Sequence, residues 1–415
     1  MNKETILSKK IDDEKLKNIG LYLLAFFIPT VLMIIVFIFI KVYPFGENLY
    51  LPVDAFGQYS SYLQYFRNLF LGNGSIIYSL SRGLGGEMYG LFAYYLLSPF
   101  NLVVLLFSKT NITISFDIIY ILKIASCSLS MVYYLNRRKK ADFANLIFGI
   151  MYGLSAYSIT YGFNIMWQDG MILLPLVVAG IDDLIDGEKG ILYIITLSLC
   201  LLTNYYIGFM ICVFSLIYFI YKIILEENKS FKTIGKFACF SICAIFISGI
   251  ILIPIFIGLK GGRADFSFSN INFNTNFEFE KIFSKFFTNS FNLEELKNNS
   301  MPEVFCGVLA NVLVMLYFLN SKIKLKEKLL SLGVLTIFIL SFCINGANLL
   351  WTMGNTPAWY MYRYAFLFVF FFIKLAQKSL ENIKMRNFIL ENNFGYFNLF
   401  YNCYIYISTK IRAFK

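Results

Sequence analysis

The sequence predicts an all-α integral membrane protein with about ten transmembrane helices. Of its 415 residues, 58% are hydrophobic, and the mean hydropathy is +0.65. Apolar stretches of about 20 residues recur along the chain, which is the length that crosses a hydrocarbon core of about 30 Å. Clusters of lysine and arginine separate these stretches, and they orient the spans because basic loops stay on the cytoplasmic side.

Two basic anchors define the first outer loop. Residues 1–20 form a charged cytoplasmic segment, and residues 21–41 form the first span, which we interpret as an anchor rather than a removed signal peptide. The basic cluster at residues 137–140 also belongs inside, so the apolar segment 115–135 must run inward. Residues 42–114 are therefore expected to form a single outer loop.

Two segments of this outer loop are predicted to touch the membrane without crossing it. The apolar segment 94–107 is interrupted by Ser98-Pro99-Phe100-Asn101, and a full crossing there would place the basic cluster at 137–140 outside. We therefore expect a re-entrant helix. Residues 58–71 are expected to form a juxtamembrane helix, because one face carries an apolar and aromatic set suited to the headgroup region: Tyr59, Tyr62, Leu63, Phe66, Leu69 and Phe70.

The later spans alternate in direction, and every dense basic cluster falls on the cytoplasmic side. They are expected at residues 142–160, 171–186, 190–203, 205–222 and 236–258. Three more follow: one from Pro302 to Lys322, one that ends at Asn345, and one at residues 359–376. A second outer loop covers residues 259–301. The polytopic domain thus covers residues 21–380, and residues 381–415 form a cytoplasmic tail or the product of a premature stop or shifted frame.

Charge and composition exclude several classes of function. The formal net charge is +11, but the lysines lie in short cytoplasmic loops, and no soluble basic domain is present to bind nucleic acid. The sequence contains no histidine. Catalysis by Ser-His-Asp or Cys-His groups and histidine metal sites are therefore excluded.

Asp54 and Asp169 are the candidate catalytic residues, because both lie at outer span ends. Asp54 follows the first span and could accept a proton from an incoming hydroxyl, or it could cap the helix that follows. Asp169 lies at the outer entrance to the span 171–186. It could orient an acceptor or bind a divalent metal ion, or it could cap that span. The sequence pattern does not require a cofactor, and it leaves open whether a divalent metal ion takes part.

Four cations are candidates for binding phosphate. Arg82 lies in a glycine-rich stretch whose backbone could approach a phosphate, although a flexible loop fits the same pattern. Lys123 lies inside a span, where a charge needs a partner, and a lipid phosphate is one such partner. Arg263 opens the second outer loop. Arg363 lies among aromatics, where stacking and snorkelling are the alternatives to phosphate binding. Two polar residues at span ends complete the substrate-binding set, and each could equally be structural: Asn204 and Glu303.

Several motifs occur in an order that resembles the bacterial YfhO membrane-protein family: DAFGQY, SRGLGGEMYGLFAYYLLSPFN, NIMWQDGMILLPL, LLTNYYIGFM, MPEVFCG and WYMYRYAFLF. The resemblance covers residues 20–380. It implies a GT-C-type glycosyltransferase fold, in which an acid in the first outer loop is catalytic and lines up here with Asp54. A second acid, in the next outer loop, lines up with Asp169. The resemblance also implies that the chain is the N-terminal part of a longer family protein.

The activity implied is inverting transfer of a sugar from a polyprenyl-phosphate carrier to an envelope acceptor, such as lipoteichoic or wall teichoic acid of Gram-positive bacteria. The active face would lie outside the cell membrane, with the N-terminus in the cytoplasm. Two alternatives remain. A transporter or flippase of lipid or polysaccharide would place ionisable residues near the midplane, where Lys123 is the one plausible deep charge. An inactive half-length membrane protein is the other.

Overall fold

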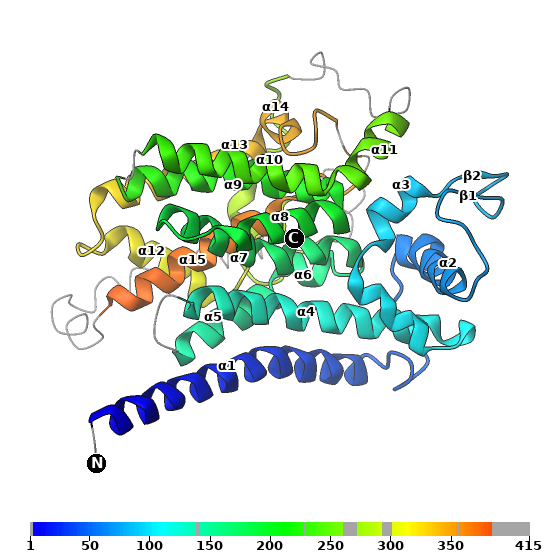
Figure 1. The fold of residues 1–415 in the computed structure, drawn as a ribbon, viewed down its shortest axis with the longest axis horizontal. Coiled ribbons are helices and arrows are strands. Elements are labelled where there is room, and N and C mark those ends of the chain that lie inside the picture. Colours follow the sequence, from blue (N-terminus) through cyan, green and yellow to red (C-terminus); the bar gives the residue numbers. More distant parts are fainter. Residues whose placement is uncertain are drawn as a thin grey trace.

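The computed structural model describes residues 3–137, 142–227, 230–259, 272–292, 301–355, 357 and 359–383. Within these ranges the protein is a helical bundle (Figure 1). Its helices are α1 (Lys3–Phe39), α4 (Ile112–Asn136), α5 (Phe143–Gly153), α6 (Ala156–Thr160), α7 (Ile165–Ile185), α8 (Ile191–Thr203), α9 (Tyr205–Leu225), α10 (Phe231–Ile247), α11 (Gly249–Leu259), α12 (Val308–Leu319), α13 (Leu325–Cys343), α14 (Asn345–Leu349) and α15 (Ala365–Asn382).

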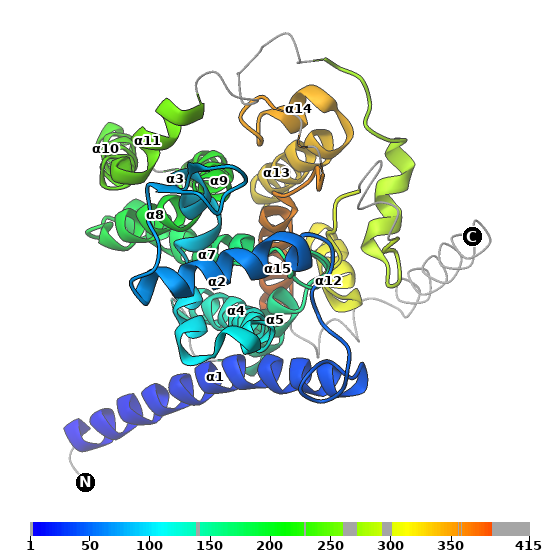
Figure 2. The same ribbon diagram turned by 90° about the vertical axis from the view of Figure 1, so that its right-hand side faces the viewer.

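The predicted first outer loop, residues 42–114, folds as a small cap at one end of this bundle, on the right in Figure 1 and facing the viewer in Figure 2. It contains the helices η1 (Ala55–Tyr59), α2 (Ser60–Phe70), α3 (Tyr89–Leu91), η2 (Phe92–Leu96), η3 (Pro99–Leu106) and η4 (Lys109–Asn111). Its two-residue strands β1 (Tyr78–Ser79) and β2 (Gly86–Glu87) pair antiparallel. A further short helix, η6 (Phe279–Phe286), lies in the second predicted outer loop.

Five helical segments in the described ranges are long and apolar enough to cross a membrane: Glu14–Phe39, Lys109–Asn136, Phe143–Thr160, Ile165–Ile185 and Tyr205–Leu225. Two bent pairs raise the number to seven if each pair is one span. The predicted count of about ten is not confirmed. The helices α8 and α12 are short, while α13 and α15 each carry three charged residues.

The predicted interruption of 94–107 is a sharp bend. The helical segments Tyr89–Leu96 and Pro99–Leu106 meet at 91°. Ser98 is extended, and Pro99 starts the second segment, where its missing N–H costs no hydrogen bond. This geometry fits a re-entrant segment or a broken span. The helix α2 forms within the predicted segment 58–71, but Leu63 and Phe66 of the predicted face are buried in the protein, whereas Phe70 of the same face is exposed.

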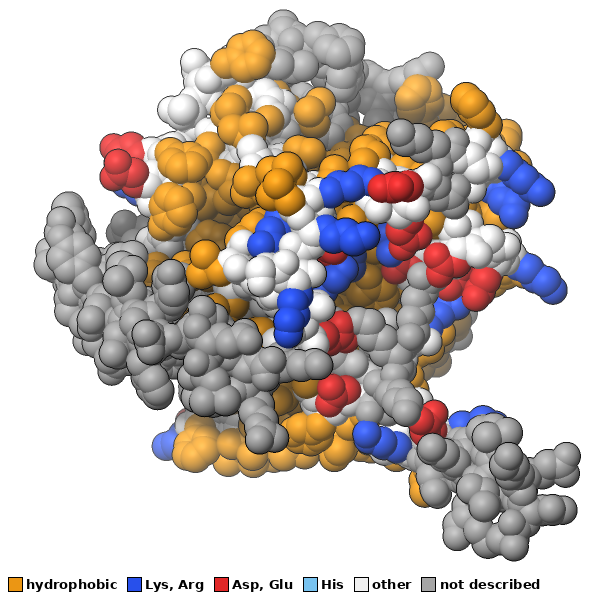
Figure 3. Space-filling model, turned by 90° about the vertical axis from the view of Figure 1, so that its left-hand side faces the viewer, with side chains coloured by type: hydrophobic (Ala, Val, Ile, Leu, Met, Phe, Trp, Pro, Cys, Tyr) orange, Lys and Arg blue, Asp and Glu red, His pale blue; other side chains and the backbone are white. Residues whose placement is uncertain are grey.

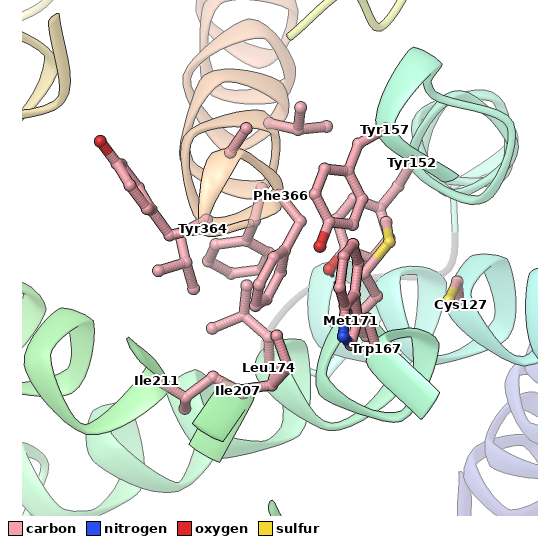
Figure 4. Packing of buried hydrophobic residues seen from close by; sticks show 14 of the residues in the cluster. Cys127, Tyr152, Tyr157, Trp167, Met171, Leu174, Ile207, Ile211, Tyr364 and Phe366 are labelled. Atoms are coloured by element: carbon pink, nitrogen blue, oxygen red, sulfur yellow. Dashed lines mark hydrogen bonds between the residues drawn. The ribbon is translucent and has the colours of Figure 1, made fainter. Parts of the chain in front are cut away.

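Large apolar side chains remain exposed along the outer helices. Leu24, Phe27 and Val31 of α1 are about half exposed, as are Ile245 and Ile253 of the bent pair α10 and α11. Apolar patches of this extent are unusual on a soluble monomer and suit contact with lipid. The interior is aromatic: in Figure 4, Tyr152, Tyr157, Trp167 and Phe366 converge from α5, α6, α7 and α15. The protein is therefore a multi-pass membrane protein.

Close helix contacts depend on glycine. A Cβ atom built on Gly180 in α7 would lie 2.4 Å from the backbone nitrogen of Tyr193 in α8. Small residues of this kind let membrane helices approach. We therefore expect Gly180→Ala to lower the free energy of unfolding by about 1–3 kcal/mol, because neither backbone can move aside cheaply.

Gly235→Ala in α10 is the matched control, since a Cβ there meets nothing within 4 Å. It should be neutral or stabilising by about 0.5–1 kcal/mol. Unfolding of both variants in detergent measures the difference, and equal stability would show that α7 and α8 are not packed this closely.

Candidate functional site

Asp54 stands at the start of the cap with its carboxylate partly exposed. It precedes η1, but its side chain makes no capping hydrogen bond. The capping alternative is therefore not what the structure shows. The helix that follows is anchored elsewhere, because the Tyr59 hydroxyl donates to Asn164 Oδ1 at 2.6 Å, just before α7. Asp54 is thus held at the end of the bundle where α7 begins.

Tyrosine rings surround this carboxylate. Burial and the negative charge of Asp54 raise the pKa of Tyr360 to about 12, against the lowering effect of Arg363. Burial raises the pKa of Tyr62. The positive charge of Arg82 opposes this shift, and the negative charge of Asp54 adds to it. Tyr62 packs on Tyr95, Tyr95 packs on Tyr94, and Tyr94 accepts a hydrogen bond from Arg363, so these groups form one cluster. Asp54 lies near the Tyr62 and Tyr360 rings of this cluster, and Arg82 lies near Tyr62. We call the end of the bundle with this cluster the aromatic end.

Arg363 is the best-positioned cation at the aromatic end. Its guanidinium lies between the rings of Trp167 and Tyr206, 5.0 and 5.2 Å from their centroids. Its Nη2 donates to the carbonyl of Trp359 at 3.0 Å, and its Nη1 donates to the hydroxyl of Tyr94 at 3.0 Å. Its Nε donates to the Tyr360 carbonyl at 3.3 Å. These three contacts fix the planar group of a half-buried residue and leave one N–H on each terminal nitrogen for an anion.

Tyr94 is a site residue that sequence reasoning missed. Its hydroxyl accepts from Trp167 Nε1 at 3.1 Å as well as from Arg363. Asn204 has a positioning role here, since its Nδ2 donates to the Tyr94 carbonyl at 2.9 Å while its Oδ1 caps α9 by accepting from Ile207 N. The signal in the sequence is the pair of tyrosines, Tyr94 and Tyr95, beside the interruption of the apolar segment 94–107.

Asp169 is not a helix cap, which corrects one of the two sequence alternatives. The helix α7 begins at Ile165, earlier than the predicted residue 171, so Asp169 lies inside it. Its carboxylate accepts from Lys123 Nζ and from Ser98 Oγ, at 2.8 and 2.9 Å. The side chains of Lys123 and Asp169 are 0% and 3% exposed. Each therefore satisfies the other's charge, and neither reaches the surface in this conformation.

The remaining candidates lie at different depths. Arg82 pairs with Glu87 at 2.9 Å across the exposed β1–β2 hairpin. Glu303 is buried and pairs with Lys285 at 3.0 Å. Burial raises the pKa of Tyr161, and the nearby charge of Glu303 adds to this effect. Because Tyr161 packs on Tyr360, Glu303 lies behind the aromatic cluster. The last candidate, Arg263, lies outside the described residues.

The donors present do not fit a divalent metal ion. Within the part of the chain that the structure describes, no group of three or more Cys, Asp or Glu side chains could hold one. Both oxygens of Asp169 are already occupied by Lys123 and Ser98. No step of the proposed chemistry is therefore routed through a metal.

Comparison with known proteins gives a family match over nearly the whole chain. The family described as bacterial membrane protein YfhO matches residues 25–414. A curated relative, the uncharacterized protein YfhO of Bacillus subtilis (strain 168), is 23% identical over 244 residues, which are 53% of this chain and 28% of that protein. The matched part thus spans less than a third of the relative's length. No solved structure matches the chain at a significant level.

Proposed function

This chain belongs to the bacterial YfhO membrane-protein family, and from that premise we propose that it transfers a sugar from a polyprenyl-phosphate carrier to an extracytoplasmic acceptor such as lipoteichoic or wall teichoic acid. The observation that carries the proposal is the aromatic end. There a partly exposed carboxylate and a fixed guanidinium flank one set of tyrosine rings. Convergent polar groups set in an aromatic wall are typical of small-molecule sites.

The proposed reaction is a single displacement with inversion at the anomeric carbon. Asp54 takes the proton of the acceptor hydroxyl, and the acceptor oxygen attacks the anomeric carbon. The bond from that carbon to the phosphate oxygen breaks, and its electron pair leaves with the polyprenyl phosphate. Arg363, with Arg82 nearby, stabilises the negative charge of the leaving phosphate. Asp54 then returns its proton to water.

Asp169 and Lys123 lie in the protein core next to this site and position it. Because they neutralise each other in the core, we assign them a positioning role: they hold the start of α7, which carries Trp167, against Ser98 of the bent segment. A GT-C-type arrangement, with the aromatic end facing outward, belongs to the same proposal. It is supported by the acid after the first span and by the bend between η2 and η3.

Transfer can be tested on the full chain reconstituted in lipid vesicles, with a radiolabelled polyprenyl-phosphate sugar and a cell-envelope acceptor fraction. We expect label to move from the lipid to the acceptor, and expression of the chain in a strain lacking the modification to restore it. Movement of label across the bilayer without transfer would favour the transporter alternative, for which the buried Lys123–Asp169 pair is the relevant feature. Absence of both activities would favour an inactive chain.

Replacing Arg363 by lysine keeps the positive charge but removes the forked guanidinium, so it tests whether the geometry of this group is needed to bind the donor phosphate. We expect Arg363→Lys to lower kcat/KM for the lipid-linked donor by about 10- to 100-fold, since an ammonium cannot keep the stacked, forked geometry. Arg67→Lys is the matched control, because Arg67 Nε donates instead to the Phe107 carbonyl, at 2.7 Å. Equal kcat/KM values for the two variants would exclude Arg363 from donor binding.

A further inference from the structure

A second polar site lies at the other end of the bundle, which we call the charged end. A cavity of about 210 Å³ opens there between α4, α7, α9 and α15. Its polar lining includes Arg137, Asp182, Tyr218, Lys222, Lys374 and Lys378. Figure 3, which looks at this end, shows lysine, arginine and acidic side chains gathered on it.

The charged end is remote from Asp54 and Arg363. Asp169 and Asp182 are both in α7, and thirteen residues of helix separate their Cα atoms by about 20 Å. Arg363 lies two residues before α15, and Lys374 is nine residues along that helix from Ala365, a distance of about 14 Å. The cavity is therefore a separate site and does not belong to the aromatic end.

The wall of this cavity is positively charged. Four cations and one carboxylate line it, which gives a net charge of +3 for the lining side chains (4 − 1). Arg137, Lys222 and Lys378 are paired with acids that do not line the cavity: Asp183, Glu226 and Glu327, respectively. Lys222 also lies 4.0 Å from the Asp182 carboxylate, which does line it. The carboxylates thus hold the cations from behind, and the cavity receives their remaining N–H donors.

Lys374 is different from the other three cations. Within the described residues it makes no ion pair. Its Nζ donates to the Tyr218 hydroxyl at 2.9 Å and lies over the rings of Tyr218, Tyr221 and Phe371. Tyr218 in turn donates to Asp182 at 2.9 Å, so the nearest acid is already bound. Burial disfavours the charged form of Lys374, and the nearby Asp182 carboxylate favours it. An anion in the cavity would stabilise the ammonium group further.

We propose that the cavity at the charged end binds a phosphate group. The volume suits a phosphate or diphosphate, the wall supplies several N–H donors, and the unpaired Lys374 supplies the charge. The phosphate could belong to a lipid headgroup or to a soluble phosphate compound, because both present the same oxygens to the cations. This site does not rest on the proposed sugar transfer.

Two probes distinguish the sources. The full chain is placed in phosphatidylcholine nanodiscs and titrated with inorganic pyrophosphate by calorimetry, and its retention of phosphatidic acid over phosphatidylcholine is measured by native mass spectrometry. Saturable pyrophosphate binding indicates a soluble ligand, while selective retention of phosphatidic acid alone indicates a headgroup. Binding of neither probe overturns the proposal.

Variants locate the binding. We expect Lys374→Gln and Lys222→Gln each to weaken the observed binding about tenfold or more, whereas Lys374→Arg retains it. Lys326→Gln is the matched control, since Lys326 pairs with Glu227 on the exposed surface of α13. Arg363→Lys should leave this binding unchanged, which separates the cavity from the phosphate-binding group of the aromatic end. Unaltered binding in both glutamine variants, each checked for an unchanged unfolding temperature, would place the anion elsewhere and overturn the proposal.

Discussion

Asp54→Asn is expected to reduce transfer of label from the polyprenyl-phosphate sugar by about 100- to 10,000-fold, the contribution of a positioned general base. An amide keeps the size of the side chain but cannot take the acceptor's proton. The carboxylate makes no capping hydrogen bond in the structure, so the fold should not depend on it. Initial rates at saturating donor, together with donor binding and unfolding temperature, measure the effect on catalysis separately from folding.

Glu47→Gln provides the matched control for charge. Glu47 is exposed in the same outer loop and precedes Asp54 by seven residues. Its neutralisation should leave the transfer rate within about twofold, because exposed charges contribute little. Undiminished transfer by Asp54→Asn would remove Asp54 from its catalytic role. An equal loss in both variants would show that the outer loop acts only through its overall charge.

Lys123→Met is expected to lower the free energy of unfolding by about 3–5 kcal/mol, because it leaves the buried Asp169 carboxylate without its counter-ion. The Asp169 carboxylate would keep only the Ser98 hydroxyl. The double variant Lys123→Met with Asp169→Leu should recover most of the loss, since removing both charges also removes their desolvation cost. Unfolding in detergent with each variant completes a double-mutant cycle.

Arg82→Met is the comparison for an exposed pair. The Arg82–Glu87 ion pair is open to solvent, with side chains 42% and 62% exposed, so its loss should have little effect on stability. If Lys123→Met costs no more than Arg82→Met, the buried pair does not hold α4 to α7, and the positioning role assigned to Asp169 fails with it.

Local sequence features predicted the helices well where they are continuous. The apolar segment 115–135 is α4 within a few residues, and Ser98-Pro99 marks a true bend. The number of spans could not be predicted in the same way. The segment 236–258 breaks at Ser248 into α10 and α11, which meet at 70°, and no charge or proline at that position announces the break.

Pairing across the bundle could not be predicted from local pattern. Lys123 and Asp169 are 46 positions apart, and their ion pair depends on how α4 packs on α7. Arg363 and Tyr94 are 269 positions apart. The sequence did place the acids and arginines at span ends, and the structure brings Asp54, Arg82 and Arg363 around one tyrosine cluster. Sequence thus identified the residue types, while tertiary packing decided which of them are buried and neutralised, as Asp169 and Glu303 are.

The most direct test of the account is the side of the membrane on which the aromatic end lies. Single cysteines are introduced by Asp54→Cys and Glu188→Cys in a background in which all eight native cysteines are replaced, and intact cells are treated with a membrane-impermeant maleimide. Position 54 should be labelled in intact cells, and position 188, in the turn after α7, only after permeabilisation. Labelling of position 188 alone, or of both positions, in intact cells would contradict an outward-facing transfer site.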